Sequence, residues 1–481
     1  MNDLPFCRRC MPSGVDPFEE RLKEISAKGG SHKRPETILL VVPPSPQKPT
    51  PGREFLITGP FEGFTCIASL VKKMGFNLKV IDCRMREDSL RLVVEGAREA
   101  EAVGIAAYCD SFIFLQEITR ILKETYPEKL LFLGGPLVTS LPEILLKNTS
   151  ADCAVLGEAE LTLIELLEGY FSGEKIILGG IKGLAYKENG MVFLNEPRSQ
   201  IANLDNLPMP DYTIWPNYGS IVANGQILIS SMRGCPQECS FCFKTIPGLR
   251  LKSLRRFAQE VAYLKRTTGF DYTWLNDLTF NVIEPRAIEI CSILKQERVK
   301  YHCFARVQNA GKLLAETLRE SGCLGIWFGI ESYSQDILDI NRKNIRIEEI
   351  NRAVDTACAA GLAVRGLFIV GLPGETEASL RSMLEFISTK GFLPLAKYLV
   401  PFPGTSLFDH ALRTGKISDI PGFLKMLSCR KVGDCDDEIV NLTSLQEGIL
   451  RRYFHDIWKI TKKREGRFEE KSGAEGNSRS F

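Results

Sequence analysis

The chain has 481 residues, of which 44% are hydrophobic and 25% charged, values typical of folded globular proteins. Its 61 Lys and Arg residues nearly balance its 59 Asp and Glu residues, which argues against a protein built to coat nucleic acid or an anionic membrane. No apolar run approaches the roughly 18 residues of a membrane-spanning helix, and the N-terminus lacks the apolar core of a secretion signal, so we expect a cytoplasmic protein without a membrane span.

The first part of the chain alternates between apolar runs and segments of helical period. After a lead-in over residues 1–34, the runs are Thr37 to Val42, Leu78 to Asp82, Ala102 to Ala107, Lys129 to Gly135 and Asp152 to Gly157. Short apolar runs of this kind are typical of parallel strands that are buried on both faces. The pattern predicts a doubly wound, Rossmann-like α/β domain over residues 35–172.

A hairpin and a linker are expected over residues 173–222, with the hairpin turning at Asn189-Gly190 and the linker marked by LPMPD at Leu207 to Asp211. A second alternation follows. Its expected strands are Ile227 to Met232, Tyr272 to Asn276, Tyr301 to Ala305, Leu324 to Ile330, Ala363 to Val370 and Ala396 to Val400. Six βα units in series predict a partial (βα)6 barrel over residues 223–410, in which chemistry is placed at the carboxyl ends of the strands.

The last part of the chain, residues 411–481, is expected to be a helical region with an amphipathic helix from Ser444 and a disordered tail over residues 469–481. A basic stretch near Lys459 to Arg467 is interrupted by acidic residues, which favours a solvated helix face over a phosphate-binding surface.

Three of the 15 cysteines form a triplet directly after the first expected barrel strand: Cys235, Cys239 and Cys242. Thiolates hold iron–sulfur clusters, and three of them leave one iron of a cubane open to another ligand. The alternatives are three thiols that merely fall close together, or part of a zinc site. Zinc favours a fourth protein ligand, and no second Cys or His pair lies nearby.

The triplet, with Phe241 just before its last cysteine, resembles the signature of the radical S-adenosylmethionine (SAM) superfamily. The resemblance implies a 4Fe–4S cluster whose open iron binds SAM. It also implies reductive cleavage of SAM to methionine and a 5′-deoxyadenosyl radical that takes hydrogen from a substrate. An electron donor such as a flavodoxin or a ferredoxin is implied as a partner.

Four further segments resemble SAM-binding motifs of that family. Asp277 in WLNDLTFN would line the SAM amino group, Glu331 in WFGIES would bind the ribose, and Gly371 in FIVGLPGET would approach the adenine. Arg306 would pair with the SAM carboxylate. Four of these residues have an alternative role: Phe241 as core, Asp277 and Glu331 as helix-terminal carboxylates, and Gly371 as a turn residue.

The order of a doubly wound domain, an LPxPD-like linker and this barrel resembles the cobalamin-binding members of the superfamily. Gly134 and Gly135 after the fourth strand would let backbone approach a corrin, and Ser111 after the third strand would meet its nucleotide tail. The chain departs from many cobalamin domains because the loop after the first strand has no His to ligate cobalt. The alternative is a vestigial domain that only packs on the barrel.

The other cysteines divide into two sets. Eight fall singly inside expected helices or strands and are expected to be buried: Cys66, Cys83, Cys109, Cys153, Cys291, Cys303, Cys323 and Cys358. Four lie toward the two ends of the chain, and a second metal site built from them is the less favoured interpretation: Cys7, Cys10, Cys429 and Cys435.

The function that follows from the resemblance is a cobalamin-dependent radical SAM enzyme that methylates an unactivated carbon of a small-molecule or biosynthetic-intermediate substrate. One alternative is a radical rearrangement or cyclisation with the same cofactors, and another is an RNA methylthiotransferase. The expected helical C-terminus does not favour the latter, and nucleic acid is not an expected partner. No residue is assigned to catalysis, and the sequence does not name the substrate.

Overall fold

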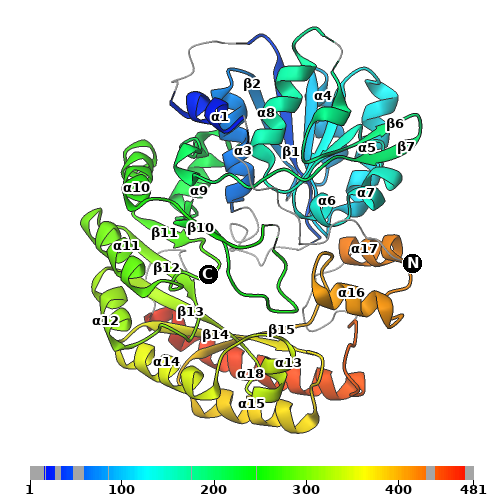
Figure 1. Cartoon of the computed structure of the whole chain (residues 1–481). Coiled ribbons are helices and arrows are strands. Elements are labelled where there is room, and N and C mark those ends of the chain that lie inside the picture. Colours follow the sequence, from blue (N-terminus) through cyan, green and yellow to red (C-terminus); the bar gives the residue numbers. More distant parts are fainter. Residues whose placement is uncertain are drawn as a thin grey trace. The chain divides into compact units, whose positions relative to one another are not determined.

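The computed structural model describes residues 16, 18–27, 34–46, 59–84, 86–174, 176–244, 246–429 and 439–471. The chain forms two compact units. The N-terminal unit comprises residues 1–219, 245–250 and 419–430, and the barrel unit comprises residues 220–244, 251–418 and 431–481. Figure 1 shows the helices and strands of the two units.

The N-terminal unit is a seven-stranded sheet in the order β2-β1-β3-β4-β5-β6-β7 with helices on both faces (Figure 1). Its strands are β1 Thr37–Val42, β2 Asn77–Asp82, β3 Ala102–Ala106, β4 Leu130–Gly134, β5 Cys153–Val155, β6 Leu184–Glu188 and β7 Met191–Leu194. Its helices are α1 Phe18–Ala27, α3 Glu62–Lys73, α4 Ser89–Ala97, α5 Phe112–Thr125, α6 Pro136–Ser140, α7 Pro142–Asn148, α8 Ala159–Tyr170 and α17 Ile420–Cys429.

The strand order in this sheet identifies where a ligand would bind. The first five strands are parallel in the order 2-1-3-4-5, which has its switch point between β1 and β3. Ligands of doubly wound sheets bind outside the carboxyl ends of the strands at this point. The Rossmann-like fold expected for this region is confirmed.

The hairpin that was expected beside the linker is instead part of this sheet. β6 pairs antiparallel with β5, and β7 pairs antiparallel with β6. The turn lies at Asn189 and Gly190, both with positive φ, as the Asn-Gly pair predicts. The hairpin buries Leu184 and Tyr186 in the same apolar core as β1 and α8.

The barrel unit is built on a six-stranded sheet in the order β15-β14-β13-β12-β11-β8, with parallel pairing throughout (Figure 1). Its strands are β8 Leu228–Ile229, β11 Tyr272–Leu275, β12 Lys300–Ala305, β13 Cys323–Glu331, β14 Ala363–Val370 and β15 Leu393–Tyr398, and the short β9 Met232–Gly234 follows β8. Its helices are α10 Leu254–Thr268, α11 Glu284–Gln296, α12 Lys312–Glu320, α13 Gln335–Ile340, α14 Ile347–Ala359, α15 Glu377–Thr389, α16 Ser406–Arg413 and α18 Glu447–Lys471.

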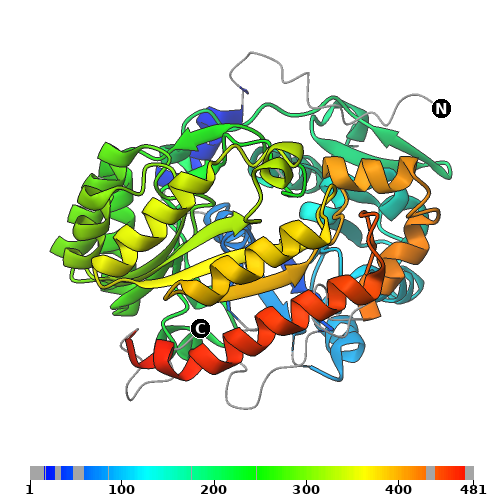
Figure 2. The ribbon, with the colours of Figure 1, turned by 90° about the horizontal axis from the view of Figure 1, so that it is seen from below.

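The remaining elements are short: α9 Tyr218–Ala223 and β10 Leu249–Leu251 at the boundary between the units, and the 3-10 turns Leu178–Gly180, Leu204–Asn206 and Tyr212–Ile214. The expected partial barrel of six βα units and the helical C-terminal region are confirmed. α18 packs on β15 and α15, as Figure 2 shows. The expected disordered tail is wrong for residues 469–471, which lie in α18, and residues 472–481 lie outside the described residues.

One strand of the barrel begins three residues earlier than its expected start at Ala396. β15 begins at Leu393 and includes Pro394, which pairs in register with Gly366. A proline is tolerated there because β15 is an edge strand of the sheet, where one side of the backbone has no strand to pair with.

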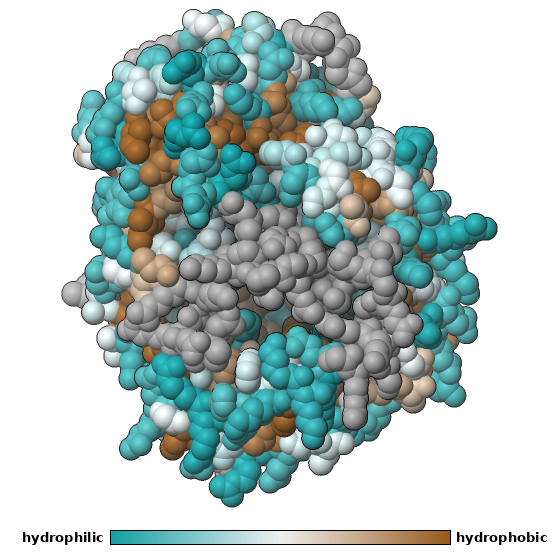
Figure 3. Space-filling model, turned by 180° about the vertical axis from the view of Figure 1, so that it is seen from behind, coloured by the Kyte–Doolittle hydropathy of each residue, from teal (hydrophilic) through white to brown (hydrophobic). Residues whose placement is uncertain are grey.

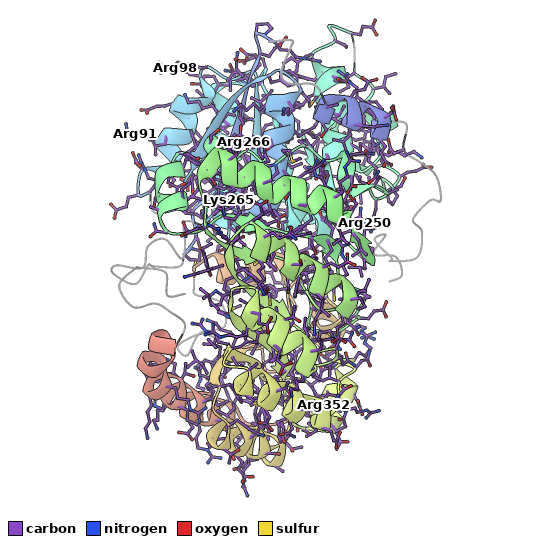
Figure 4. The ribbon with its side chains drawn as sticks, turned by 90° about the vertical axis from the view of Figure 1, so that its left-hand side faces the viewer. Arg91, Arg98, Arg250, Lys265, Arg266 and Arg352 are labelled. Carbon is purple, nitrogen blue, oxygen red and sulfur yellow. The ribbon has the colours of Figure 1, made fainter. Side chains whose placement is uncertain are left out.

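On the face seen in Figure 3, teal side chains predominate and apolar ones form limited patches. No described helix is both long enough and apolar enough to cross a membrane. Several basic side chains that Figure 4 labels are engaged locally: Arg91 with Asp88 and Glu95, and Arg250 with Glu158.

Candidate functional site

The three cysteines of the triplet lie on the loop that follows β9 in the barrel unit. Cys235 is buried, whereas Cys239 and Cys242 are half-buried. Cys235 Sγ lies 3.6 Å from Thr279 Oγ1, in the loop after β11. The loop therefore sits at the carboxyl end of the barrel sheet, where such folds place their chemistry.

The thiols influence one another electrostatically. Burial, followed by the nearby Cys239 and Cys235, raises the pKa of Cys242 to about 11, and Lys343 and Lys244 oppose that rise. A thiol with so high a pKa is protonated at neutral pH unless a metal displaces its proton. Binding of a metal or cluster by Cys242 would therefore release a proton.

Within the described ranges, no three His, Cys, Asp or Glu side chains are placed to hold one metal ion. In a cubane cluster each thiolate binds a different iron, so the three sulfurs need not converge on one point.

Asp277, expected beside the SAM amino group, has both oxygens engaged. Oδ1 accepts from the backbone N–H groups of Ser231 (2.8 Å) and Met232 (3.1 Å), and Oδ2 accepts from Ser231 Oγ (2.7 Å). The side chain is 1% exposed. Asp277 thus fixes the segment that leads into the cysteine loop, and we propose this positioning role for it beside the expected SAM contact.

Glu331 closes β13 with an unusual backbone. Its φ is 68°, in the left-handed region, and the pairing with β14 shifts register between Gly329 and Glu331. A non-glycine residue keeps such a conformation only where its surroundings hold it. Here the carboxylate accepts a hydrogen bond from the Lys343 ammonium at 2.9 Å, and both side chains are buried.

Arg306, expected to clamp the SAM carboxylate, makes contacts within the protein. Its guanidinium donates to the Lys343 carbonyl at 2.6 Å, the Asn344 carbonyl at 3.2 Å and Gln308 Oε1 at 2.9 Å. Arg306 therefore supports the turn that carries Lys343, and the SAM contact stays a prediction.

Phe241 and Gly371 lie on the two loops expected to hold SAM. The Phe241 ring centroid lies 5.8 Å from Lys343 Nζ, a cation–π arrangement. Gly371 has a φ of 100° and donates its N–H to Glu375 Oε2 at 2.7 Å. Only glycine adopts such a φ without strain, so the Gly-rich loop has the tight turn that its sequence predicts.

Sequence reasoning missed Lys343. The residue follows Glu331 by twelve positions, across α13 and a turn in which Arg342 and Asn344 both have a φ of 53°. Spacing alone gives no indication that this lysine returns to β13. The charged side chains near the cysteine loop therefore include an ammonium group as well as the carboxylate of Glu331.

The inner face of the barrel sheet is aromatic. Tyr301 on β12 points outward, because its hydroxyl donates to Cys291 on α11 at 3.1 Å. Alternate residues of the strands therefore face inward. Trp274, Phe304 and Trp327 meet on that inner face, with ring centroids 4.9–5.5 Å apart.

The residues expected to bind cobalamin lie at the carboxyl edge of the N-terminal sheet. A Cβ at Gly134 would meet nothing within 4 Å, so the backbone there faces open space. Gly135 has a φ of 115°, and a Cβ there would press on the Ala107 carbonyl at 3.1 Å. This glycine pair gives the bare backbone edge that a large flat ligand needs.

Ser111 is a different case. Its hydroxyl donates to the Tyr108 carbonyl at 2.8 Å and accepts from the Tyr108 N–H at 2.9 Å, and the residue is 1% exposed. The hydroxyl thus closes the turn before α5, and its expected contact with a nucleotide tail stays a prediction. Most of the loop after β1, residues 47–58, lies outside the described residues.

The remaining cysteines are mostly as expected. Cys83, Cys153, Cys291, Cys303 and Cys323 are buried and Cys66 and Cys109 half-buried, but Cys358 on α14 is exposed, so its expected burial is wrong. A single polar-face position on an amphipathic helix can hold a cysteine without burying it. Of the end set, Cys7, Cys10 and Cys435 lie outside the described residues and Cys429 is exposed.

The fold is an α/β sheet unit followed along the chain by a barrel unit that carries the thiol loop. Comparison with known families agrees. Residues 229–387 match the model of the radical SAM superfamily, and residues 59–167 match the model of the B12 binding domain.

The chain is similar to several known proteins. It is 32% identical over 387 residues to an uncharacterized methyltransferase of Pyrococcus horikoshii, covering 78% of this chain and 83% of that protein. It is 26% identical over 421 residues to the anaerobic magnesium-protoporphyrin IX monomethyl ester cyclase of Cereibacter sphaeroides, covering 82% and 68%. The radical SAM methyltransferase TsrM of Kitasatospora setae, solved with cobalamin and a [4Fe-4S] cluster, shares the fold with a TM-score of 0.66, at 16% identity and 89% coverage of each chain.

The chain belongs to the radical SAM superfamily, among the members that carry an N-terminal B12-binding domain. It is therefore an enzyme whose cofactors are a 4Fe–4S cluster, SAM and cobalamin.

Proposed function

We propose that this protein is a cobalamin-dependent radical SAM methyltransferase that methylates an unactivated carbon of a small-molecule substrate. The observation that carries the proposal is the thiol triplet at the carboxyl end of the barrel sheet, in a chain that also has a B12-binding domain. The relative from Pyrococcus horikoshii is itself described as a methyltransferase.

Within this proposal, Cys235, Cys239 and Cys242 hold the 4Fe–4S cluster. When bound, the cluster supplies an electron for the cleavage of SAM at its open iron, and cobalamin supplies a carrier for the methyl group. A flavodoxin or ferredoxin of the cytoplasm is the proposed source of electrons.

In this proposal, residues of the chain bind and orient SAM and the corrin. Glu331 would accept hydrogen bonds from the ribose hydroxyls of SAM, and the Lys343 ammonium, 2.9 Å away, holds its carboxylate in place. Gly371 in the Gly-rich loop has no side chain, so its backbone would approach the adenine ring of SAM. Gly134 and Gly135 have no side chains, so the corrin would lie against their backbone.

The test uses anaerobically reconstituted protein with SAM, a chemical reductant, and hydroxocobalamin present or absent. We expect a corrin absorption band in the protein and release of both 5′-deoxyadenosine and S-adenosylhomocysteine, the latter only with cobalamin. Release of 5′-deoxyadenosine without S-adenosylhomocysteine would show that the methyl group of SAM does not pass to the corrin, and would contradict the proposed methyl transfer. The Cys235→Ala variant is expected to lose iron and both products, and unchanged iron and SAM cleavage would falsify the cluster assignment.

A further inference from the structure

The middle of the cysteine loop is fixed at a single residue, Ser240, which lies between Cys239 and Cys242 and is 5% exposed. Its N–H donates to the Asn341 carbonyl at 3.0 Å, and its hydroxyl donates to Asn341 Oδ1 at 2.9 Å. Its carbonyl accepts from the Leu407 N–H and from Ser406 Oγ, each at 3.2 Å. Every polar group of Ser240 is therefore engaged within the barrel unit.

Asn341 connects this loop to a second one. The residue follows α13 and is 1% exposed. Its side-chain amide donates to the Pro373 carbonyl at 3.1 Å and to the Ile337 carbonyl at 2.9 Å. Pro373 belongs to the Gly-rich loop that begins at Gly371. Both amide protons and the amide oxygen are thus used, and one side chain joins the cysteine loop, the Gly-rich loop and the end of α13.

The turn that carries Asn341 is itself held from outside. The next residue, Arg342, has a φ of 53° and donates to Ser406 Oγ at 2.7 Å, and Ser406 in turn bonds to Ser240. Arg306 donates to the carbonyls of Lys343 and Asn344. Because these contacts fix a strained turn, Asn341 has a defined position from which to hold both loops.

We propose that Asn341 is a positioning residue that fixes the cysteine loop against the Gly-rich loop, and so sets where SAM meets the open iron. This inference rests on the proposed function, since it requires a cluster on one loop and SAM on the other. Residues behind the ligands of a metal centre orient those ligands, and a small misplacement of reacting groups is costly. A change at Asn341 should therefore affect how SAM engages the cluster more than whether the cluster binds.

The experiment compares five anaerobically reconstituted proteins: wild type, Ser240→Ala, Asn341→Ala, the double variant of these two, and a control. Ser240→Ala removes only the hydroxyl bond and keeps the backbone bond to Asn341. Asn351→Ala is the matched control, because Asn351 also donates two hydrogen bonds, to the Tyr333 hydroxyl and the Ile347 carbonyl, away from both loops. Iron content, the Kd for SAM and the change that SAM causes in the electron paramagnetic resonance spectrum of the reduced cluster are measured.

We expect wild-type iron content in all variants. The loss of one hydrogen bond in Ser240→Ala should weaken SAM binding about fivefold, and Asn341→Ala should weaken it more and reduce the spectral change. The double variant should resemble Asn341→Ala, because the two residues act through one contact.

Two results would overturn the inference. One is an unchanged Kd and spectrum in both Ser240→Ala and Asn341→Ala, and the other is an equal shift in Asn351→Ala, which would indicate a general loss of stability. The proposed function fails separately, in the wild type, if that protein binds no cluster or if SAM leaves the cluster spectrum unchanged.

Discussion

The carboxylate of Glu331 lies 2.9 Å from the ammonium group of Lys343, and the two side chains are 11% and 8% exposed. The pair joins the end of β13 to the turn after α13 within the barrel unit. A buried ion pair contributes little net stability as a pair, but the loss of one partner leaves a charge in a poorly solvated place.

Lys343→Met is therefore expected to lower the free energy of unfolding by about 3–5 kcal/mol, and the double variant with Glu331→Gln should recover much of that loss. Chemical denaturation measures both. Lys390→Met is the control, because its partner Asp355 is 60% exposed, and the expected loss there is at most about 1 kcal/mol. Equal losses at Lys343 and Lys390 would contradict this account of the buried pair.

The triplet cysteines should differ from the single ones in a simple assay. Cys242→Ala should bind much less iron than wild type on anaerobic reconstitution, since the cluster would lose one of its three thiolates. Cys358→Ala, at an exposed single cysteine on α14, should bind iron like wild type. Iron and sulfide analysis and the absorption spectrum measure this, and an iron content in Cys242→Ala equal to that in Cys358→Ala would remove Cys242 from the cluster.

Glu375 in the Gly-rich loop predicts a pH dependence of stability. Burial raises its pKa from 4.5 to about 8, although the backbone N–H groups of Gly371 and Leu372 oppose that rise. Its Oε1 has no hydrogen-bond partner among the described residues. Between pH 4.5 and about pH 8, the folded state keeps a proton on Glu375 that the unfolded state has lost. Glu375 therefore makes the free energy of unfolding fall as pH rises.

Glu375→Gln, which mimics the protonated form, should reduce that fall. The effect is at most about 1.4 kcal/mol per pH unit between roughly pH 4.5 and 8. Denaturation midpoints of wild type and variant at several pH values measure it. Parallel pH profiles for the two proteins would mean that Glu375 is ionised in the fold.

A substitution at Gly134 tests whether cobalamin binds at the carboxyl edge of the N-terminal sheet. A Cβ at this position meets nothing within 4 Å, so Gly134→Val should leave the melting temperature almost unchanged while it fills space proposed for the corrin. We expect weaker binding of hydroxocobalamin, measured by absorption after gel filtration. Gly391→Val is the control, since a Cβ at Gly391 also meets nothing within 4 Å, and Gly391 lies in the barrel unit just before the amino end of β15. Equal cobalamin binding by both variants would place the corrin elsewhere.

Much of the fold follows from local pattern. In the run Thr37–Val42 the five residues after Thr37 are apolar and buried, because a parallel strand covered on both faces has no solvent side. The Asn189-Gly190 turn follows from the positive φ that those residues tolerate. The hairpin's membership of the first sheet could not be predicted, because strand pairing depends on distant residues rather than on the strand itself.

By itself, the sequence determined the two α/β units, the thiol triplet and the family, because strand–helix alternation, cysteine spacing and motif order are local features of the chain. Only the tertiary structure decided the partners of those residues. It brought Lys343 to Glu331, turned Arg306 toward the carbonyls of a turn, and placed Asn341 between two loops. Such contacts join residues far apart in the sequence, and their positions depend on how α13 and its turn pack against the sheet, which spacing along the chain does not encode.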